Sequence, residues 1–172
     1  MKLIAHSDFP PSSVKQILAK WGSDGAGHRV VEFIVEGGEG ILLPSLSPAS
    51  RTDGLWKTTC FELFIKPDDT DRYFEFNFSP STAWAAYAFE GYRSGMCDLP
   101  IEPPRIEGRE DGVRVTLDLS SLPEPPWHVG LSAIIQEKDG IKSYWALAHP
   151  PGKPDFHHPD CFVLELPAAG QP

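Results

Sequence analysis

The chain has 172 residues, in which 15 Lys and Arg stand against 24 Asp and Glu, and its formal net charge is −9. Duplex nucleic acid and anionic membrane surfaces attract clustered positive charge, so this balance argues against both as partners. Hydrophobic residues make up 41% of the chain, and 18 Pro and 15 Gly supply turn signals. These values predict one folded domain that is rich in turns and has a core of its own.

The first residues, MKLIAHSDFPPSS, hold too short an apolar run for a secretory signal, which needs about 7–15 apolar residues. The sequence also lacks the ~18 consecutive apolar residues of a transmembrane helix. Cys60, Cys97 and Cys161 are widely spaced and odd in number, which predicts reduced thiols rather than disulfides or a zinc site. We therefore expect a cytoplasmic protein.

Short apolar runs separated by turn signals predict an all-β fold. Residues 12–21 fit either a helix with one apolar face or a strand, and we favour the strand. The stretch 98–108 is expected to be a loop. The remaining strands are predicted at 28–36, 60–66, 73–79, 83–89, 113–119, 129–138, 143–149 and 161–166.

The strands on either side of the loop 67–72 predict a hairpin with symmetric register. This register pairs Glu62 with Asn77, and it gathers the aliphatic and Phe side chains of both strands on the core face. Glu62 and Asn77 then lie together on the other face, where their acceptors and donors suit a polyhydroxylated ligand. The alternative is a structural polar pair, joined to each other or to Arg51.

Glu75 lies on the same face as Glu62 in this hairpin. Two carboxyl groups at ~5–9 Å are what glycoside hydrolysis requires. Lys66 is expected to neutralise Glu75, so catalysis is not favoured. The chain also lacks a nucleophile elbow and a Gly-rich phosphate loop, and we predict no catalytic residue.

A second hairpin is predicted at Asp139-Gly140, a signal for a two-residue type I′ turn. Such a turn pairs residue 136 with 143 and 134 with 145, which places Trp145 beside Gln136. An indole next to an amide suits the apolar face and the edge of a sugar ring. The alternative is that Trp145 belongs to the core.

The segment 149–160 has the densest titratable chemistry in the chain. His149, Asp155 and His157 are the candidates for a metal site, but their spacing matches no metal-binding motif, and we predict no bound metal. We favour a rigid loop at the rim of a ligand groove. Tyr87, Tyr92 and Arg93 are placed at the edge of the same groove.

Three blocks of sequence resemble the bacterial DOMON-like domain family: RTDGLWKTTCFELF (51–64), YFEFNFSPSTAWAAY (73–87) and SYWALAHPPGKPDFHH (143–158). That family belongs to the group of DOMON domains and family 9 carbohydrate-binding modules. The resemblance implies a single antiparallel β-sandwich, of jelly-roll or immunoglobulin-like type, over residues 1–166. Residues 167–172 are then a flexible C-terminal tail, and the segment 14–21 is the first core strand.

The resemblance also implies a function. Family 9 modules bind sugars between two tryptophans, and carboxylate, amide and Arg side chains contact the hydroxyls. The positions here that match this pattern are Trp56, Glu62, Asn77, Gln136 and Trp145. Arg51 and His149 are expected at the rim of the same site.

We therefore expect non-catalytic binding of a small polar ligand without a cofactor, with a saccharide or cell-wall sugar precursor as the favoured class. Haem is an alternative, because other DOMON domains bind it through Met or His. Met96 and one of His149, His157 and His158 are the ligands available here. A histidine-loop enzyme, and a module that binds a protein partner through the apolar patch around Trp145, also remain open.

Overall fold

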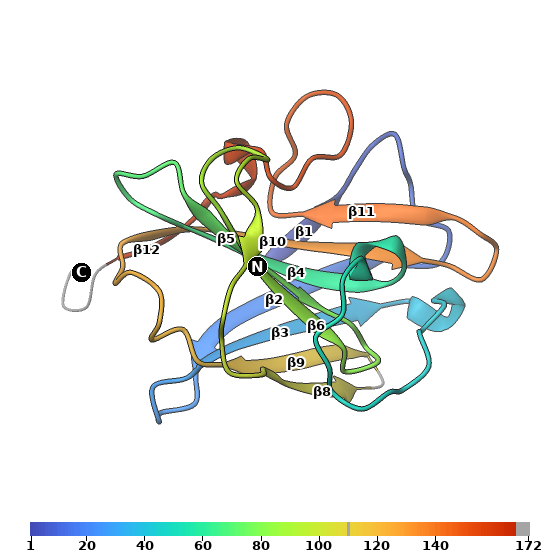
Figure 1. Ribbon diagram of the computed structural model, residues 1–172. Coiled ribbons are helices and arrows are strands. Elements are labelled where there is room, and N and C mark those ends of the chain that lie inside the picture. The colour runs from blue at the N-terminus through green and yellow to red at the C-terminus, as the bar shows by residue number, and fades with distance from the viewer. Residues whose placement is uncertain (110, 168–172) are drawn as a thin grey trace.

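The computed structural model describes residues 1–109 and 111–167 (Figure 1). Within these ranges the chain forms strands and three short 3-10 helices, η1 (Gly38–Gly40), η2 (Leu55–Lys57) and η3 (Pro159–Cys161). The strands are β1 (Lys2–Ala5), β2 (Gln16–Ser23), β3 (Arg29–Glu36), β4 (Cys60–Pro67), β5 (Tyr73–Phe78), β6 (Trp84–Phe89), β7 (Cys97–Asp98), β8 (Arg105–Arg109), β9 (Gly112–Leu117), β10 (Trp127–Gln136), β11 (Lys142–Ala146) and β12 (Leu164–Leu166).

All the paired strands are antiparallel, in the order β7-β6-β5-β4-β10-β11-β1-β2-β3-β9-β8, and β12 pairs with β10. The strand β1 joins two wings, because it pairs with β11 on one side and with β2 on the other. We call β2, β3, β9 and β8 the short wing, and β4–β7 with β10–β12 the long wing. In Figure 1, β10 and β11 of the long wing lie above β3 and β9 of the short wing.

The two wings share one apolar core. Phe33 on β3 and Phe61 on β4 meet across it, with ring centroids 4.9 Å apart. Alternate residues of each strand point into this core, as the period of two in a strand requires. Burying each large apolar side chain stabilises the fold by roughly 1.5–3 kcal/mol. The sheet therefore curls around its own inner face, with β7 and β8 at its two ends.

The long wing is also covered on its outer face. Every residue of β5 and of β6 is buried. A second apolar cluster lies on the outer face, where Phe64 and Tyr73 meet Phe156 and Phe162 of the segment that follows β11. A strand with both faces covered offers protected positions on its outer side, and this is where the polar residues of β4 and β5 lie.

The all-β antiparallel prediction is confirmed, and residues 16–23 form a strand as favoured. The pairing of Glu62 with Asn77 is also confirmed. The loop predicted at 98–108 is wrong in part, because residues 105–109 pair with β9 as the edge strand β8. From residue 168 onward, the predicted tail lies outside the described residues.

The register predicted for the second hairpin is wrong by one residue. Trp145 pairs with Ala133, and residue 136 pairs with 142. The connection is a three-residue loop instead of a two-residue turn: the Glu137 N–H donates to the Ile141 carbonyl at 2.8 Å, and Gly140 closes the loop at φ 90°. Loops of this kind use a type I turn followed by a left-handed residue. The single extra residue reverses the face of Trp145 relative to β10.

No helix in the described part of the chain is long and apolar enough to cross a membrane. All three cysteines are free; Cys60 and Cys161 are buried, and Cys97 is exposed.

Candidate functional site on the outer face of the long wing

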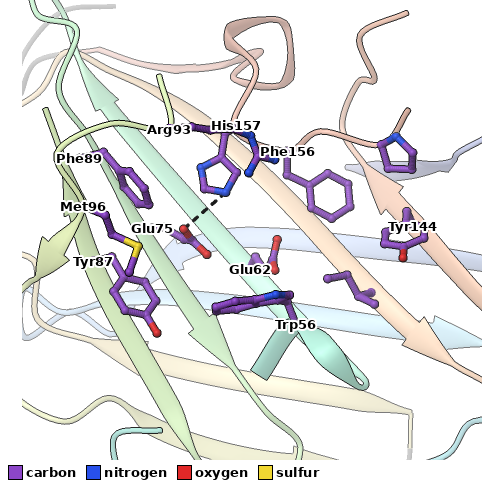
Figure 2. Close-up of a pocket in the computed structure, with 12 residues that line it drawn as sticks. Trp56, Glu62, Glu75, Tyr87, Phe89, Arg93, Met96, Tyr144, Phe156 and His157 are labelled. Atoms are coloured by element: carbon purple, nitrogen blue, oxygen red, sulfur yellow. Dashed lines mark ion pairs between the residues drawn. The ribbon is translucent and has the colours of Figure 1, made fainter. Parts of the chain in front are cut away.

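A pocket of about 410 Å³ lies on the outer face of the long wing (Figure 2). Strands β4, β5, β6, β10 and β11 supply its floor, and η2, the 90–96 turn and the segment 154–157 supply its walls. The lining residues are Trp56, Glu62, Glu75, Tyr87, Phe89, Arg93, Met96, Ile134, Tyr144, Pro154, Phe156 and His157. A cavity of this size, with apolar walls and a few polar groups, suits a small ligand.

Two carboxyl groups form the floor. Glu62 on β4 is 3% exposed, and Glu75 on β5 is 5% exposed. Ser132 Oγ donates to Glu62 Oε2 at 2.9 Å, and Asn77 Nδ2 donates to Glu75 Oε1 at 2.7 Å. Each carboxyl group is thus held by a buried neighbour on its own or the next strand.

Burial changes the protonation of this pair. Loss of water around the charge, helped by the nearby Glu75, raises the pKa of Glu62 to about 8. Burial also raises the pKa of Glu75, while hydrogen bonding from Asn77 and the charge of Arg93 oppose the rise. At neutral pH this pair of carboxyl groups therefore holds a proton, whereas an exposed carboxyl group would have released its proton.

The guanidinium of Arg93 lies at the wall of the pocket and is already matched by a carboxylate. Its Nη2 lies 2.7 Å from Asp155 Oδ1, and its Nε donates to the same oxygen at 3.2 Å. The Tyr92 hydroxyl also donates to Asp155. Burial alone raises the pKa of Asp155, but the hydrogen bonds from Arg93 and Tyr92 outweigh it and leave this pKa below its ordinary value.

His157 carries a proton donor into the pocket. The Tyr73 hydroxyl accepts from the Arg93 backbone N–H at 3.2 Å and lies 2.8 Å from His157 Nδ1. We assign the proton of the neutral imidazole to Nε2, because this nitrogen faces the carboxyl oxygen Glu75 Oε2 at 3.7 Å, as the dashed line in Figure 2 marks, and Nδ1 can then accept from the Tyr73 hydroxyl. Burial, together with the charge of Arg93, lowers the pKa of His157 to about 4, so the ring is neutral near pH 7.

Aromatic rings complete the walls. The indole of Trp56 is 41% exposed and lies below the Glu62 carboxyl group in Figure 2. Gly54 adopts φ 74° at the start of η2, a left-handed conformation that glycine tolerates and that turns Trp56 toward the pocket. Tyr87 lies on β6 and donates its hydroxyl proton to Asp53 at 2.7 Å. An accessible indole beside buried polar groups is the arrangement on which a sugar ring can stack.

The structure brings some of the predicted site residues together. Trp56 and Glu62 line the pocket, and so do Tyr87 and Arg93. Asn77 lies behind the floor, where it orients Glu75. The role expected for Lys66 is wrong, because no ion pair joins it to Glu75 in the described residues; the basic side chain within 4 Å of Glu75 is His157, whose ring is neutral near pH 7.

The structure places Trp145 and Gln136 elsewhere. Trp145 is 3% exposed, belongs to the core between the wings and donates Nε1–H to Ser143 Oγ at 2.9 Å. Gln136 ends β10 and is absent from the pocket lining. The predicted pair of indole and amide depended on the two-residue turn, and it is lost with the corrected register.

Arg51 and His149 also lie outside the pocket. Arg51 donates to the carbonyl oxygens of Ala86 and Leu99, and its guanidinium lies 5.1 Å from the centroid of the Trp84 ring. His149 Nε2 lies 2.8 Å from the Ile4 carbonyl oxygen. Both side chains tie loops to the sheet.

The candidate metal ligands are not brought together, since His149 is not among the residues that line the pocket with His157, and Asp155 pairs with Arg93. In the described ranges, no group of three or more His, Cys, Asp and Glu side chains is arranged to hold a metal ion. Of the residues considered for haem, Met96 and His157 line the pocket, whereas His158 caps η3 by accepting from the Asp160 N–H.

Five residues of the lining were not predicted from the sequence: Phe89, Ile134, Tyr144, Pro154 and Phe156. The corrected register of β10 and β11 identifies Tyr144, because it turns this residue to the outer face with Ile134. Phe156 stands between Asp155 and His157, and its apolar side chain within a polar loop is a signal that the loop folds back on the sheet.

No protein-family model matches the chain, and no curated protein matches it. Among solved structures, the chain is similar to the crystal structure of a "putative carbohydrate-binding protein" from Bacteroides uniformis ATCC 8492, with a TM-score of 0.63. The two share 12% identity, and the match covers 92% of this chain and 80% of that chain. At this identity the likeness is one of fold.

Proposed function

We propose that the pocket on the outer face of the long wing binds a saccharide without transforming it. The observation that carries the proposal is the exposed indole of Trp56 next to the two buried carboxyl groups of Glu62 and Glu75. A sugar ring presents apolar C–H faces and hydroxyl edges. It therefore matches a cavity with an aromatic wall and a polar floor.

The polar groups of the pocket offer both kinds of hydrogen-bond partner. Glu62 and Glu75 supply acceptor oxygens, and His157 supplies the Nε2–H donor. These groups are held by Ser132, Asn77 and Tyr73, so little side-chain entropy is lost when a ligand binds. A hydroxyl group both donates and accepts, so sugar hydroxyls can use all three.

The fold adds independent support. The similar structure from Bacteroides uniformis is described as that of a "putative carbohydrate-binding protein", and the match covers 92% of this chain. The two wings around one core are also compatible with the β-sandwich of the DOMON-like family and of family 9 carbohydrate-binding modules. We propose the same general class for this chain, with the cavity rather than Trp145 as the binding site.

Haem fits this pocket less well than a saccharide does. Met96 and His157 line it, as an axial pair would require. However, the floor consists of two buried carboxyl groups, and a flat apolar macrocycle above them would leave Glu62 Oε1 and Glu75 Oε2 without water or donors. We therefore propose a ligand that carries its own hydrogen-bond donors.

A thermal-shift screen followed by calorimetry tests the proposal. Mono- and disaccharides, amino-sugar fragments and hemin are added in turn to the purified chain. A ligand at 100 times its Kd stabilises the native state by about 2.7 kcal/mol, which shifts the unfolding temperature measurably. The sugars should be recovered unchanged by chromatography.

The variant Trp56→Ala should abolish the saccharide shift while leaving the fold intact, because the indole is exposed. Leu46→Ala is the matched control, since Leu46 is 81% exposed and lies outside this pocket. A shift with hemin alone, or a saccharide shift that survives in Trp56→Ala, would contradict the proposal.

A further inference from the structure

The charges that line the pocket do not balance. The lining contains the carboxyl groups of Glu62 and Glu75 and the guanidinium of Arg93, and it contains no lysine. The positive charge of Arg93 is already matched by Asp155 at 2.7 Å, and Asp155 is not part of the lining. The charged groups of the lining that remain without a partner of opposite charge are therefore the carboxyl groups of Glu62 and Glu75.

The hydrogen bonds of the floor are unequal as well. Glu62 Oε2 accepts from Ser132, and Glu75 Oε1 accepts from Asn77. No described donor lies within hydrogen-bond distance of the other two oxygens, Glu62 Oε1 and Glu75 Oε2, and the nearest approach is His157 Nε2 at 3.7 Å from Glu75 Oε2. Both side chains are at least nine-tenths buried and line the cavity. Two carboxyl oxygens of largely buried side chains thus face the cavity without a donor from another described residue.

The walls favour a positive charge for a separate reason. Aromatic rings attract cations to their faces through the ring quadrupole, and tryptophan does so most strongly. Trp56, Tyr87 and Phe89 surround the two carboxyl groups in Figure 2. The net charge of −9 also raises the local concentration of cations around the molecule.

We propose that the pocket selects a saccharide that carries an ammonium group, such as an amino sugar with a free amine, with its nitrogen between Glu62 and Glu75. This inference rests on the proposed function and specifies its ligand class. An ammonium has three N–H donors, enough for both free carboxyl oxygens and one further acceptor. A neutral hydroxyl has one donor, and a carboxylated sugar would add a third acid to the two on the floor.

The protonation of the pair is consistent with this assignment. Burial raises the pKa of both carboxyl groups, and the charge of Arg93 offsets this rise only in part. An ammonium placed between them favours their ionised forms and offsets the effect of burial. The ligand would then add to the partial compensation that Arg93, already paired with Asp155, provides.

Isothermal titration calorimetry with four probes tests the inference. Glucosamine, glucose, N-acetylglucosamine and glucuronate are titrated separately into the chain at about pH 6.5 and low salt. Charge pairing in a partly desolvated site predicts that glucosamine binds about ten-fold more tightly than glucose, or better. N-acetylglucosamine should lose this advantage because its nitrogen is neutral, and glucuronate should bind more weakly than glucose.

Two variants of the floor, Glu75→Gln and Glu62→Gln, should each bring the affinity for glucosamine down toward that for glucose. The affinity for glucose should change by only a few-fold, because Gln keeps the shape and one acceptor. Glu36→Gln is the control, since Glu36 is exposed at the end of β3. Circular dichroism confirms that each variant is folded, and either variant alone suffices for the test.

The possible failures are distinguishable. Equal affinity for glucose and glucosamine, with both lost in Trp56→Ala, would overturn the ammonium inference and leave the saccharide proposal standing. Tighter binding of glucuronate would also overturn it, and would identify Arg93 as the recognising group. No binding of any probe would count against the proposed function and the inference together.

Discussion

Replacing Glu62 with Gln should make the stability of this protein less dependent on pH. In the native state, burial next to Glu75 raises the pKa of Glu62 to about 8, from an ordinary value of 4.5. The native state therefore binds more protons than the unfolded state between these two values. By linkage, the free energy of unfolding falls as pH rises through this window, and the stabilisation is complete only below about pH 4.5.

The size of the effect follows from the two pKa values. Each pKa unit corresponds to about 1.4 kcal/mol, so the shift from 4.5 to about 8 gives an upper limit of about 5 kcal/mol for the loss. His157 acts in the opposite direction. Its pKa is lowered to about 4 from 6.5, so its contribution to stability rises with pH through that range. The difference between wild type and Glu62→Gln cancels the His157 contribution.

Urea unfolding, followed by tryptophan fluorescence at pH 5, 6, 7 and 8, measures this difference. Wild type should lose up to about 1.4 kcal/mol per pH unit relative to Glu62→Gln, most clearly between pH 5 and 7.5. The exposed control Glu36→Gln should run parallel to wild type. If wild type and Glu62→Gln gave parallel curves, Glu62 would be ionised in the native state at neutral pH, and the reasoning would be refuted.

Three further variants test the structural roles assigned above, each by the midpoint and slope of urea unfolding. Trp145→Ala removes a buried indole between the wings and should lower the free energy of unfolding by about 3–5 kcal/mol. The purified variant should keep its saccharide affinity, and loss of binding in the folded variant would mean that Trp145 is part of the binding site. Arg51→Ala removes the side-chain donor of the Leu99 carbonyl and one of the two donors of the Ala86 carbonyl, which keeps the Leu99 N–H; it should cost about 1.5–3 kcal/mol, and an unchanged midpoint would contradict this. Gly112→Ala should cost more than about 3 kcal/mol, because φ at this residue is 150° and a Cβ there would lie 1.9 Å from the Phe33 carbonyl oxygen. If the Gly112→Ala protein had normal stability, β3 and β9 would not be packed as described.

The alternation of apolar residues was enough to predict most strands and the face on which each side chain lies. It succeeded for β4 and β5 because Glu62 and Asn77 are symmetric about their loop. It failed for β10 and β11 because a sequence with Asp139-Gly140 is compatible with loops of two or three residues. The choice between them depends on a hydrogen bond from Glu137 to Ile141, which is a property of the folded hairpin.

The candidate site was predictable only where it is local. Glu62 could be identified from strand parity, whereas the contacts of Arg93 and His157 depend on two loops that meet above β5. The positions of these loops are determined by the pairing of distant strands, and no short pattern in the sequence encodes that pairing. The strands β1 and β8 were missed for a related reason: each is short and partly exposed, and each owes its conformation to its neighbours.

The position of β1 between the wings has a consequence for how the chain reaches its native state. Ile4 pairs with Ala146, so closing the sheet at this point joins residues about 140 positions apart. Ordering so long a loop is entropically costly and slows folding, as for other topologies dominated by distant contacts. Until β1 is in place, β2 and β11 each expose an unpaired edge that another chain can extend. Refolding at high protein concentration should therefore compete with aggregation, and the closure at β1 is the step that ends this competition.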